Sequence, residues 1–162
     1  MRTLSLSPLA RLAALAPLSA RVIVGIIMFA HGLQKLLGGP ANFGGALEGM
    51  GVPLPVLMAF VVTLVEVVGG LLLIIGLLSR LSALLLTIDL VVAILLVKLS
   101  IGLIAPQGAP GAGAELDLAL IAGLLVVLFA GPGRLSADHA LGIEPDVVAE
   151  APSTRGDRAR TT

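Results

Sequence analysis

Four long apolar segments constrain the fold of this chain more than any other feature of its sequence. They cover residues 18–37, 55–78, 81–99 and 115–131. The length of each segment is close to the about 20 residues that a helix needs to cross the hydrocarbon core of a bilayer. Only 12% of the residues are charged, whereas a soluble domain carries about 25%. The pattern predicts an all-α membrane protein, a bundle of four transmembrane helices.

Glycine and proline separate the apolar segments. Residues 38–53 contain several of both and predict a loop between the first two segments, and residues 106–111 predict another before the fourth. Ser79 and Arg80 alone join the second and third segments, which predicts a tight helical hairpin.

The regions outside the apolar segments complete the expected domain organisation. We expect residues 1–17 to form a cytoplasmic segment, part of which lies on the inner membrane surface. Residues 18–141 are expected to form the membrane domain. Residues 142–162 are polar and contain proline, which predicts a disordered cytoplasmic tail.

The distribution of Lys and Arg predicts the orientation in the membrane. If both termini are inside, the inner side holds Arg2, Arg11, Arg21, Arg80, Arg134, Arg155, Arg158 and Arg160, and the outer half holds only Lys35 and Lys98. Cytoplasmic loops carry the excess of basic residues in membrane proteins. We therefore expect both the N-terminus and the C-terminus of this membrane protein to lie in the cytoplasm.

Composition excludes several classes of function. The ten basic residues balance the ten acidic ones, so no basic excess is available to bind nucleic acid. The chain has no Cys, which excludes disulfides and thiolate metal sites. His31 alone lies within an apolar segment, since His139 lies in the cytoplasmic part, so bis-histidine haem ligation has too few ligands. We expect no metal and no covalently bound cofactor.

A few ionisable residues inside the apolar segments predict a polar cluster. His31 and Lys35 are four residues apart and share a helical face. At ~1.5 Å per residue, Lys35 lies ~21 Å above Arg21, and Glu66 lies ~21 Å above Arg80. Glu115 stands above small residues that favour close helix packing. These four residues are predicted to face the bundle interior in the outer leaflet, with Asp89 as a deeper member.

Two further charged residues are predicted to lie at the outer rim. Asp117 shares a helical face with Leu124 and other large apolar residues, which predicts that it faces lipid. Lys98 is about half a turn away from Asp89 around its helix. We expect Lys98 and Asp117 to form a rim pair or to extend toward the interface.

Three residues on the inner side are interpreted as anchors. Arg80 and Arg134 are expected at the inner face of the membrane, and Asp138 is expected to pair with one of them. Ser136 is a suitable N-cap for a short helix after the fourth segment.

The polar cluster allows three interpretations. In the first, Lys35 and Glu66 neutralise each other and fix the register of the helices. In the second, the cluster binds an amphipathic ligand such as a quinone headgroup. His31 or Lys35 would then donate to a carbonyl oxygen, and Glu66 would orient the donor or move a proton. The third interpretation is a path for an ion or a proton.

Several short motifs, in order, resemble the DoxX family of small bacterial integral membrane proteins. They are His31-Gly32-Leu33-Gln34-Lys35, the segment from Phe43 to Pro53, Glu66-Val67-Val68-Gly69-Gly70, the segments from Gly76 to Arg80 and from Gly113 to Leu116, and the segment from Gly131 to Asp138. The resemblance covers about residues 21–141. It carries over the positions of Lys35, Glu66, Arg80, Glu115, Arg134 and Asp138, whereas Asp89 is outside the pattern.

The resemblance implies a four-helix membrane protein linked to respiration or oxidative stress. One branch of the family resembles subunits of a thiosulfate:quinone oxidoreductase, and others look like partners in membrane-associated oxidoreductase complexes. We therefore expect an accessory subunit that binds a quinone-like ligand or a redox protein, alone or as a homo-oligomer. Because the chain has no redox centre of its own, autonomous catalysis is not expected. The alternatives are a small transporter or proton-coupled permease, and a purely structural interaction protein.

Overall fold

The computed structural model describes residue 12 and residues 15–108 and 111–144, and every regular element in them is helical. The helices are α1 (Ala16–Gly38), α2 (Pro40–Gly49), α3 (Pro55–Ile75), α4 (Ser79–Ala93), the π-helical segment η2 (Ile94–Lys98), α5 (Leu99–Ile101), α6 (Ala114–Ala130) and α7 (Ala137–Ala140). The predicted all-helical class is confirmed for this part of the chain. The surface segment expected near the N-terminus and the expected C-terminal tail lie almost entirely outside the described residues.

Three of the described helical stretches are long and apolar enough to cross a membrane. They are Ala16–Gly38, Pro55–Ile75 and the continuous stretch Ser79–Ile101, which combines α4, η2 and α5. Large apolar side chains such as Ile23 and Leu64 point outward from them and are more than half exposed. Outward-facing apolar surfaces of this extent suit contact with lipid, so the protein is a membrane protein.

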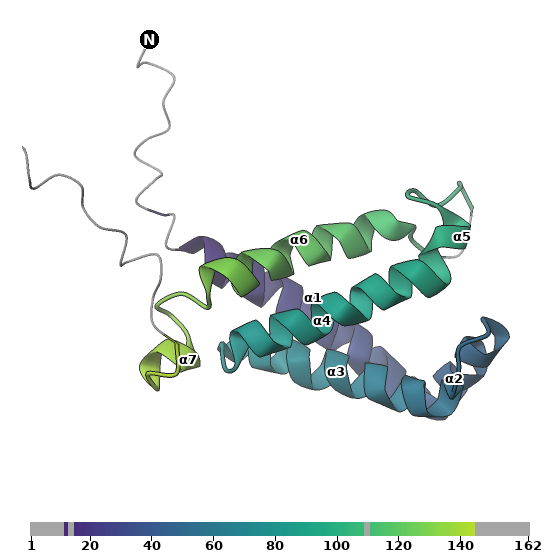
Figure 1. Ribbon diagram of the computed structural model, residues 1–162, viewed down its shortest axis with the longest axis horizontal. Coiled ribbons are helices and arrows are strands. Elements are labelled where there is room, and N and C mark those ends of the chain that lie inside the picture. Colours follow the sequence, from purple (N-terminus) through teal and green to yellow (C-terminus); the bar gives the residue numbers. More distant parts are fainter. Residues whose placement is uncertain (1–11, 13–14, 109–110, 145–162) are drawn as a thin grey trace, which may run out of the picture.

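The long helices form two packed pairs. α1 lies along α3, α6 lies along α4, and the pairs meet through contacts of α3 with α4 and of α1 with α6 (Figure 1). The core between them contains the fully buried Met28, Leu73, Leu86, Leu124 and Val127. α7 lies at one end of the bundle, and α2 and α5 lie at the other (Figure 1). We call these the α7 end and the α2 end.

Glycines allow the backbones of α1 and α3 to approach closely. A Cβ atom added to Gly70 would lie 2.5 Å from the backbone nitrogen of Phe29, and one added to Gly32 would lie 2.6 Å from that of Val67. Neither position can hold a larger side chain unless the helices separate. Small residues at such contacts are typical of helix packing in membranes.

The loop predicted between the first two apolar segments contains a helix instead. α2 starts at Pro40, whose fixed φ suits the first turn of a helix. Gly44 and Leu47 are buried, and a Cβ atom added to Gly44 would lie 3.0 Å from the Cα of Val56 on α3. Packing against α3 thus outweighs the low helix propensity of the glycines in this segment.

Two helices begin near the α7 end. α4 begins at Ser79, two residues before the predicted start of the third apolar segment. The hydroxyl of Ser136 accepts a hydrogen bond from the His139 backbone nitrogen at 3.1 Å and caps α7. The prediction that Ser136 caps a short helix is therefore confirmed.

Candidate functional site

A partly buried ion pair joins α1 and α3 in the half of the bundle nearer the α2 end. Lys35 Nζ donates to Glu66 Oε2 at 2.5 Å, and the side chains are 23% and 6% exposed. Lys35 Nζ also lies 5.3 Å from the ring centroid of Phe43 on α2, within the range of a cation–π contact. A Cβ atom at Gly32 would lie 2.8 Å from Glu66 Cβ, so this glycine permits the helix approach that brings the pair together.

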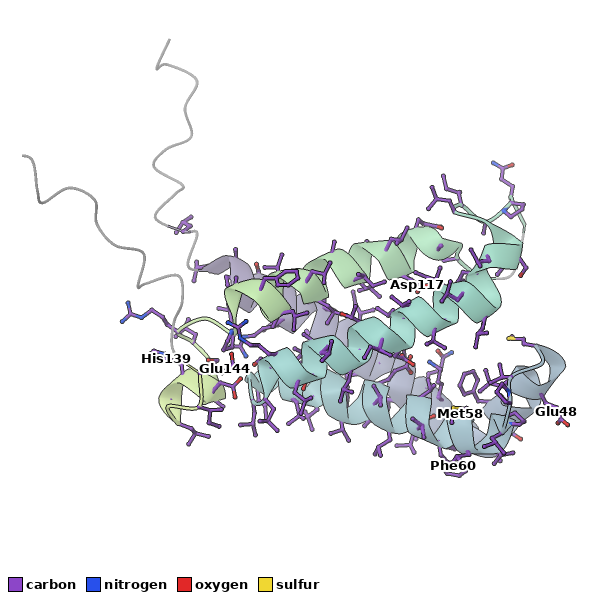
Figure 2. The ribbon with its side chains drawn as sticks, viewed as in Figure 1. Glu48, Met58, Phe60, Asp117, His139 and Glu144 are labelled. Carbon is purple, nitrogen blue, oxygen red and sulfur yellow. The ribbon has the colours of Figure 1, made fainter. Side chains whose placement is uncertain are left out.

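The buried carboxylate of α6 is Asp117, not Glu115. Asp117 is only 8% exposed, whereas Glu115 is exposed. Asp117 lies toward the α5 side of α6 (Figure 2). Asp117 Oδ2 is buried and has no hydrogen-bond partner among the residues that the structure describes. The sequence interpretation, with Glu115 facing inward and Asp117 facing lipid, is wrong.

The physical reason for this correction is the choice of packing face on α6. Its buried residues include Asp117, Leu120 and Leu124, which lie three and seven residues apart along one face. The small residues Ala119 and Ala122 face outward instead. The inward face of α6 therefore includes large side chains, while Gly123 approaches α1, where an added Cβ atom would lie 2.7 Å from Val24 Cγ2.

Asp89 and His31 complete a cluster drawn from four helices. Asp89 on α4 is partly buried, and the charges of Glu66, Lys35 and Asp117 act on it. His31 on α1 is partly buried and lies close enough to Asp117 for an electrostatic interaction. We call His31, Lys35, Glu66, Asp89 and Asp117 the interhelical cluster.

Lys98 lies beside the interhelical cluster but forms no rim pair with Asp117. Its Nζ donates to the carbonyl oxygen of Ala112 at 2.6 Å, while its charge still acts on Asp117. Lys98 is the last residue of the π-helical segment η2. Single-turn π-helices are often found at functional sites.

Two carboxylates of the interhelical cluster receive no hydrogen bond from a side chain of the described residues. Glu66 is paired with Lys35, while Asp89 and Asp117 accept no hydrogen bond from another side chain within the described ranges. Such carboxylates can accept a hydrogen bond from a ligand or take up a proton. No group of three or more His, Cys, Asp or Glu residues in the described part of the chain is arranged to hold a metal ion.

A second polar network closes the α7 end, and Arg21 is its centre. Arg21 is 2% exposed. Its guanidinium donates to the carbonyl oxygens of Leu73 and Ile74, both at 3.2 Å, and to that of Leu135. Gly76 has a φ of +73°, and a Cβ there would collide with the guanidinium. The sequence predicted Arg21 only as one of the basic residues on the inner side.

Asp138 caps α4 in this network. Its carboxylate oxygens accept hydrogen bonds from the backbone nitrogens of Leu78 at 2.7 Å and Ser79 at 2.9 Å. Its charge also acts on Arg21. Both carboxylate oxygens thus accept hydrogen bonds from backbone N–H groups at the start of α4. An anion is stabilised there by the positive end of the helix dipole. Asp138 was predicted to pair with Arg80 or Arg134, and in the structure it forms this cap instead.

The two predicted anchor arginines differ in their environment. Arg80 Nε donates to Glu144 at 2.6 Å, and its guanidinium also donates to the carbonyl oxygen of Leu128 near the end of α6. Arg134 is exposed. A cavity of about 450 Å³ lies nearby, lined by Leu15, Leu18, Arg134, Leu135 and His139. This cavity is at the α7 end, away from Asp117 (Figure 2).

Apolar helices with a polar cluster at their centre define an integral membrane protein. The model of the DoxX family matches residues 16–99, and this chain belongs to that family. It is 38% identical to "Uncharacterized membrane protein Rv3486" of Mycobacterium tuberculosis, over 75% of this chain and 78% of that relative. It is 36% identical to "Putative oxidoreductase CatD" of Bacillus subtilis, over 73% and 81%. No solved structure matches the chain significantly.

Proposed function

We propose that this protein is an accessory membrane subunit of a redox complex and that its interhelical cluster binds a quinone-like headgroup. The observation that carries the proposal is a cluster of five ionisable residues from four helices inside an apolar bundle. Ionisable residues at membrane depth are costly and usually functional. A redox association is supported by the Bacillus subtilis relative, whose name is "Putative oxidoreductase CatD".

The residues of the interhelical cluster have distinct roles in this proposal. Lys35, held by Glu66 at 2.5 Å, donates a hydrogen bond to a carbonyl oxygen of the headgroup. His31 lies one helical turn before Lys35 and is a second donor or a proton carrier. Phe43, beside Lys35, provides an aromatic wall. The chain contains no Cys, so a partner protein supplies the redox centre.

The proposal includes a topology with four crossings and both termini in the cytoplasm. α6 is the fourth crossing, because its 17 residues extend ~25 Å beside α4 and α1. Arg21, Arg80 and Arg134 gather at the α7 end, which suits the cytoplasmic side. A periplasmic reporter fused at residue 107 is expected to be active, and a reporter active only in the cytoplasm would contradict this orientation.

The binding proposal is tested by the quinone content of the protein purified in nanodiscs from its native membrane. About one quinone per chain is expected, and Lys35→Met and Glu66→Gln are expected to lose it. Glu48→Gln is the control, because Glu48 is exposed on α2. Melting temperatures of all variants separate loss of binding from loss of structure. If no form carries quinone and the two cluster variants only melt earlier, the cluster is structural.

Asp89 and Asp117 support a second candidate, a proton-coupled permease. They are carboxylates within the apolar bundle, and neither forms a salt bridge in the part of the chain that the structure describes. Membrane carboxylates of this kind recur in proton relays. Substrate flux in liposomes that carry the purified protein, dependent on a proton gradient and absent in Asp89→Asn, would favour this candidate over the subunit.

A further inference from the structure

One oxygen of the buried Asp117 carboxylate lacks a hydrogen-bond donor among the described residues. Its residue is 8% exposed, and Oδ2 has no partner among the described residues. A buried acceptor left without a donor costs free energy, and more so when it is charged. An unsatisfied buried group of this kind indicates that a donor outside the described residues completes the site.

Each of the two ammonium groups that act on Asp117 directs one N–H group at another acceptor. Lys35 Nζ donates to Glu66 at 2.5 Å, and Lys98 Nζ donates to the carbonyl oxygen of Ala112 at 2.6 Å. The other groups that act on Asp117 are His31 and the acidic Glu115, and Asp117 in turn acts on Asp89. The side of the interhelical cluster formed by Asp89 and Asp117 is therefore rich in acceptors.

We infer that the headgroup bound at the interhelical cluster donates a hydrogen bond from a hydroxyl group to Asp117 Oδ2, so that the site prefers a quinol to the corresponding quinone. A quinone carries two carbonyl oxygens, which only accept hydrogen bonds, whereas a quinol carries two hydroxyl groups, which both donate and accept. A hydroxyl of a quinol can therefore donate to Asp117 Oδ2, which a carbonyl oxygen of a quinone cannot do. This inference rests on the proposed function and adds the redox form of the ligand.

Three probes of nearly the same shape separate the effect of the donor from that of shape. They are durohydroquinone, duroquinone and the dimethyl ether of durohydroquinone, which has the ring but no hydroxyl hydrogen. Binding is measured under anaerobic conditions by equilibrium dialysis against the full chain in nanodiscs, with empty nanodiscs as the blank. Durohydroquinone is expected to bind at least about tenfold more tightly than either of the others, as one hydrogen bond to a charged group implies.

Two variants assign the preference to one carboxylate. Asp117→Asn removes the charge, keeps the size of the side chain, and is expected to reduce the preference to less than about threefold. Glu115→Gln is the matched control, because Glu115 is exposed on the same turn of α6, and it is expected to keep the full preference. A melting curve of each variant verifies that the bundle is folded.

The outcomes distinguish this inference from the proposed function. If all three probes bind equally, or if Asp117→Asn keeps the preference, the inference is overturned while a ligand site at Lys35 and Glu66 stands. If duroquinone binds more tightly than durohydroquinone, the inference is again overturned and the proposed function survives. If none of the probes binds above the blank, both are overturned, and water or a proton satisfies Asp117.

Discussion

Replacing Lys35 with methionine tests whether the ion pair between α1 and α3 is buried in the membrane. Met keeps most of the length of Lys but leaves Glu66, 6% exposed, without its cation. Breaking a buried pair costs about 3–5 kcal/mol, and an unpaired charge at the centre of a membrane helix costs about 2.5–3.5 kcal/mol. Because Lys35 is 23% exposed, we expect Lys35→Met to lose about 3 kcal/mol of unfolding free energy.

The assay is reversible unfolding in mixed micelles with increasing denaturing detergent, followed by circular dichroism. The double variant Lys35→Met/Glu66→Leu is expected to recover most of the loss, because an apolar pair can replace a buried ion pair with little cost. The control Lys98→Met removes a lysine that donates to a carbonyl oxygen and forms no salt bridge in the described part of the chain, and a loss of about 1 kcal/mol of unfolding free energy is expected. A loss below about 0.5 kcal/mol for Lys35→Met would refute the reasoning, since exposed pairs contribute that little.

Three further stability predictions use the same unfolding assay. Gly32→Ala should lower the unfolding free energy by about 1–3 kcal/mol, because the added Cβ atom would lie 2.6 Å from Val67 N. The control Gly45→Ala should lower it by nothing, because no atom lies within 4 Å of the added Cβ atom. Equal losses in the two variants would contradict the close approach of α1 and α3. Gly76→Ala should lose more than about 1 kcal/mol, because φ is +73° and Arg21 fills the space; a neutral effect would count against the network at the α7 end. Asp138→Ala should lower the unfolding free energy by about 2 kcal/mol, and Asp138→Asn should lower it by less. An unchanged unfolding free energy in Asp138→Ala would mean that the hydrogen bonds from Leu78 and Ser79 to Asp138 do not stabilise the protein.

The sequence predicts the long helices well because membrane helices are specified by length and apolarity alone. α1 and α3 begin within two residues of the predicted segments, and their ends differ from the predicted ends by no more than three residues. The contact of Lys35 with Glu66 was also predictable, since equal depth on two inward faces leaves few other partners. In the structure the two side chains meet at 2.5 Å.

The rotation of a helix about its axis is far harder to predict from one sequence. α6 is apolar on every side, so hydrophobic periodicity could not show that Asp117 faces inward and Glu115 outward. The same limit applies to Arg21, whose partners are backbone carbonyl oxygens of α3 and of the segment before α7. Such contacts depend on tertiary packing and leave no side-chain pattern in the sequence. α2 was predicted as a loop because its sequence contains several glycines. Its helix is stabilised by packing on α3, which the sequence pattern does not show.

Photolabelling with a photoreactive quinone analogue is the most direct test of a ligand site at the interhelical cluster. The analogue is irradiated with the full chain in nanodiscs, and the labelled residues are located by peptide mass spectrometry. We expect adducts on α1 near Lys35, on α3 near Glu66 and on α6 near Asp117, and we expect unlabelled quinone to compete. Adducts confined to the cavity lined by Leu15, Leu18 and Leu135, or spread evenly over the lipid-facing surfaces without competition, would contradict the account.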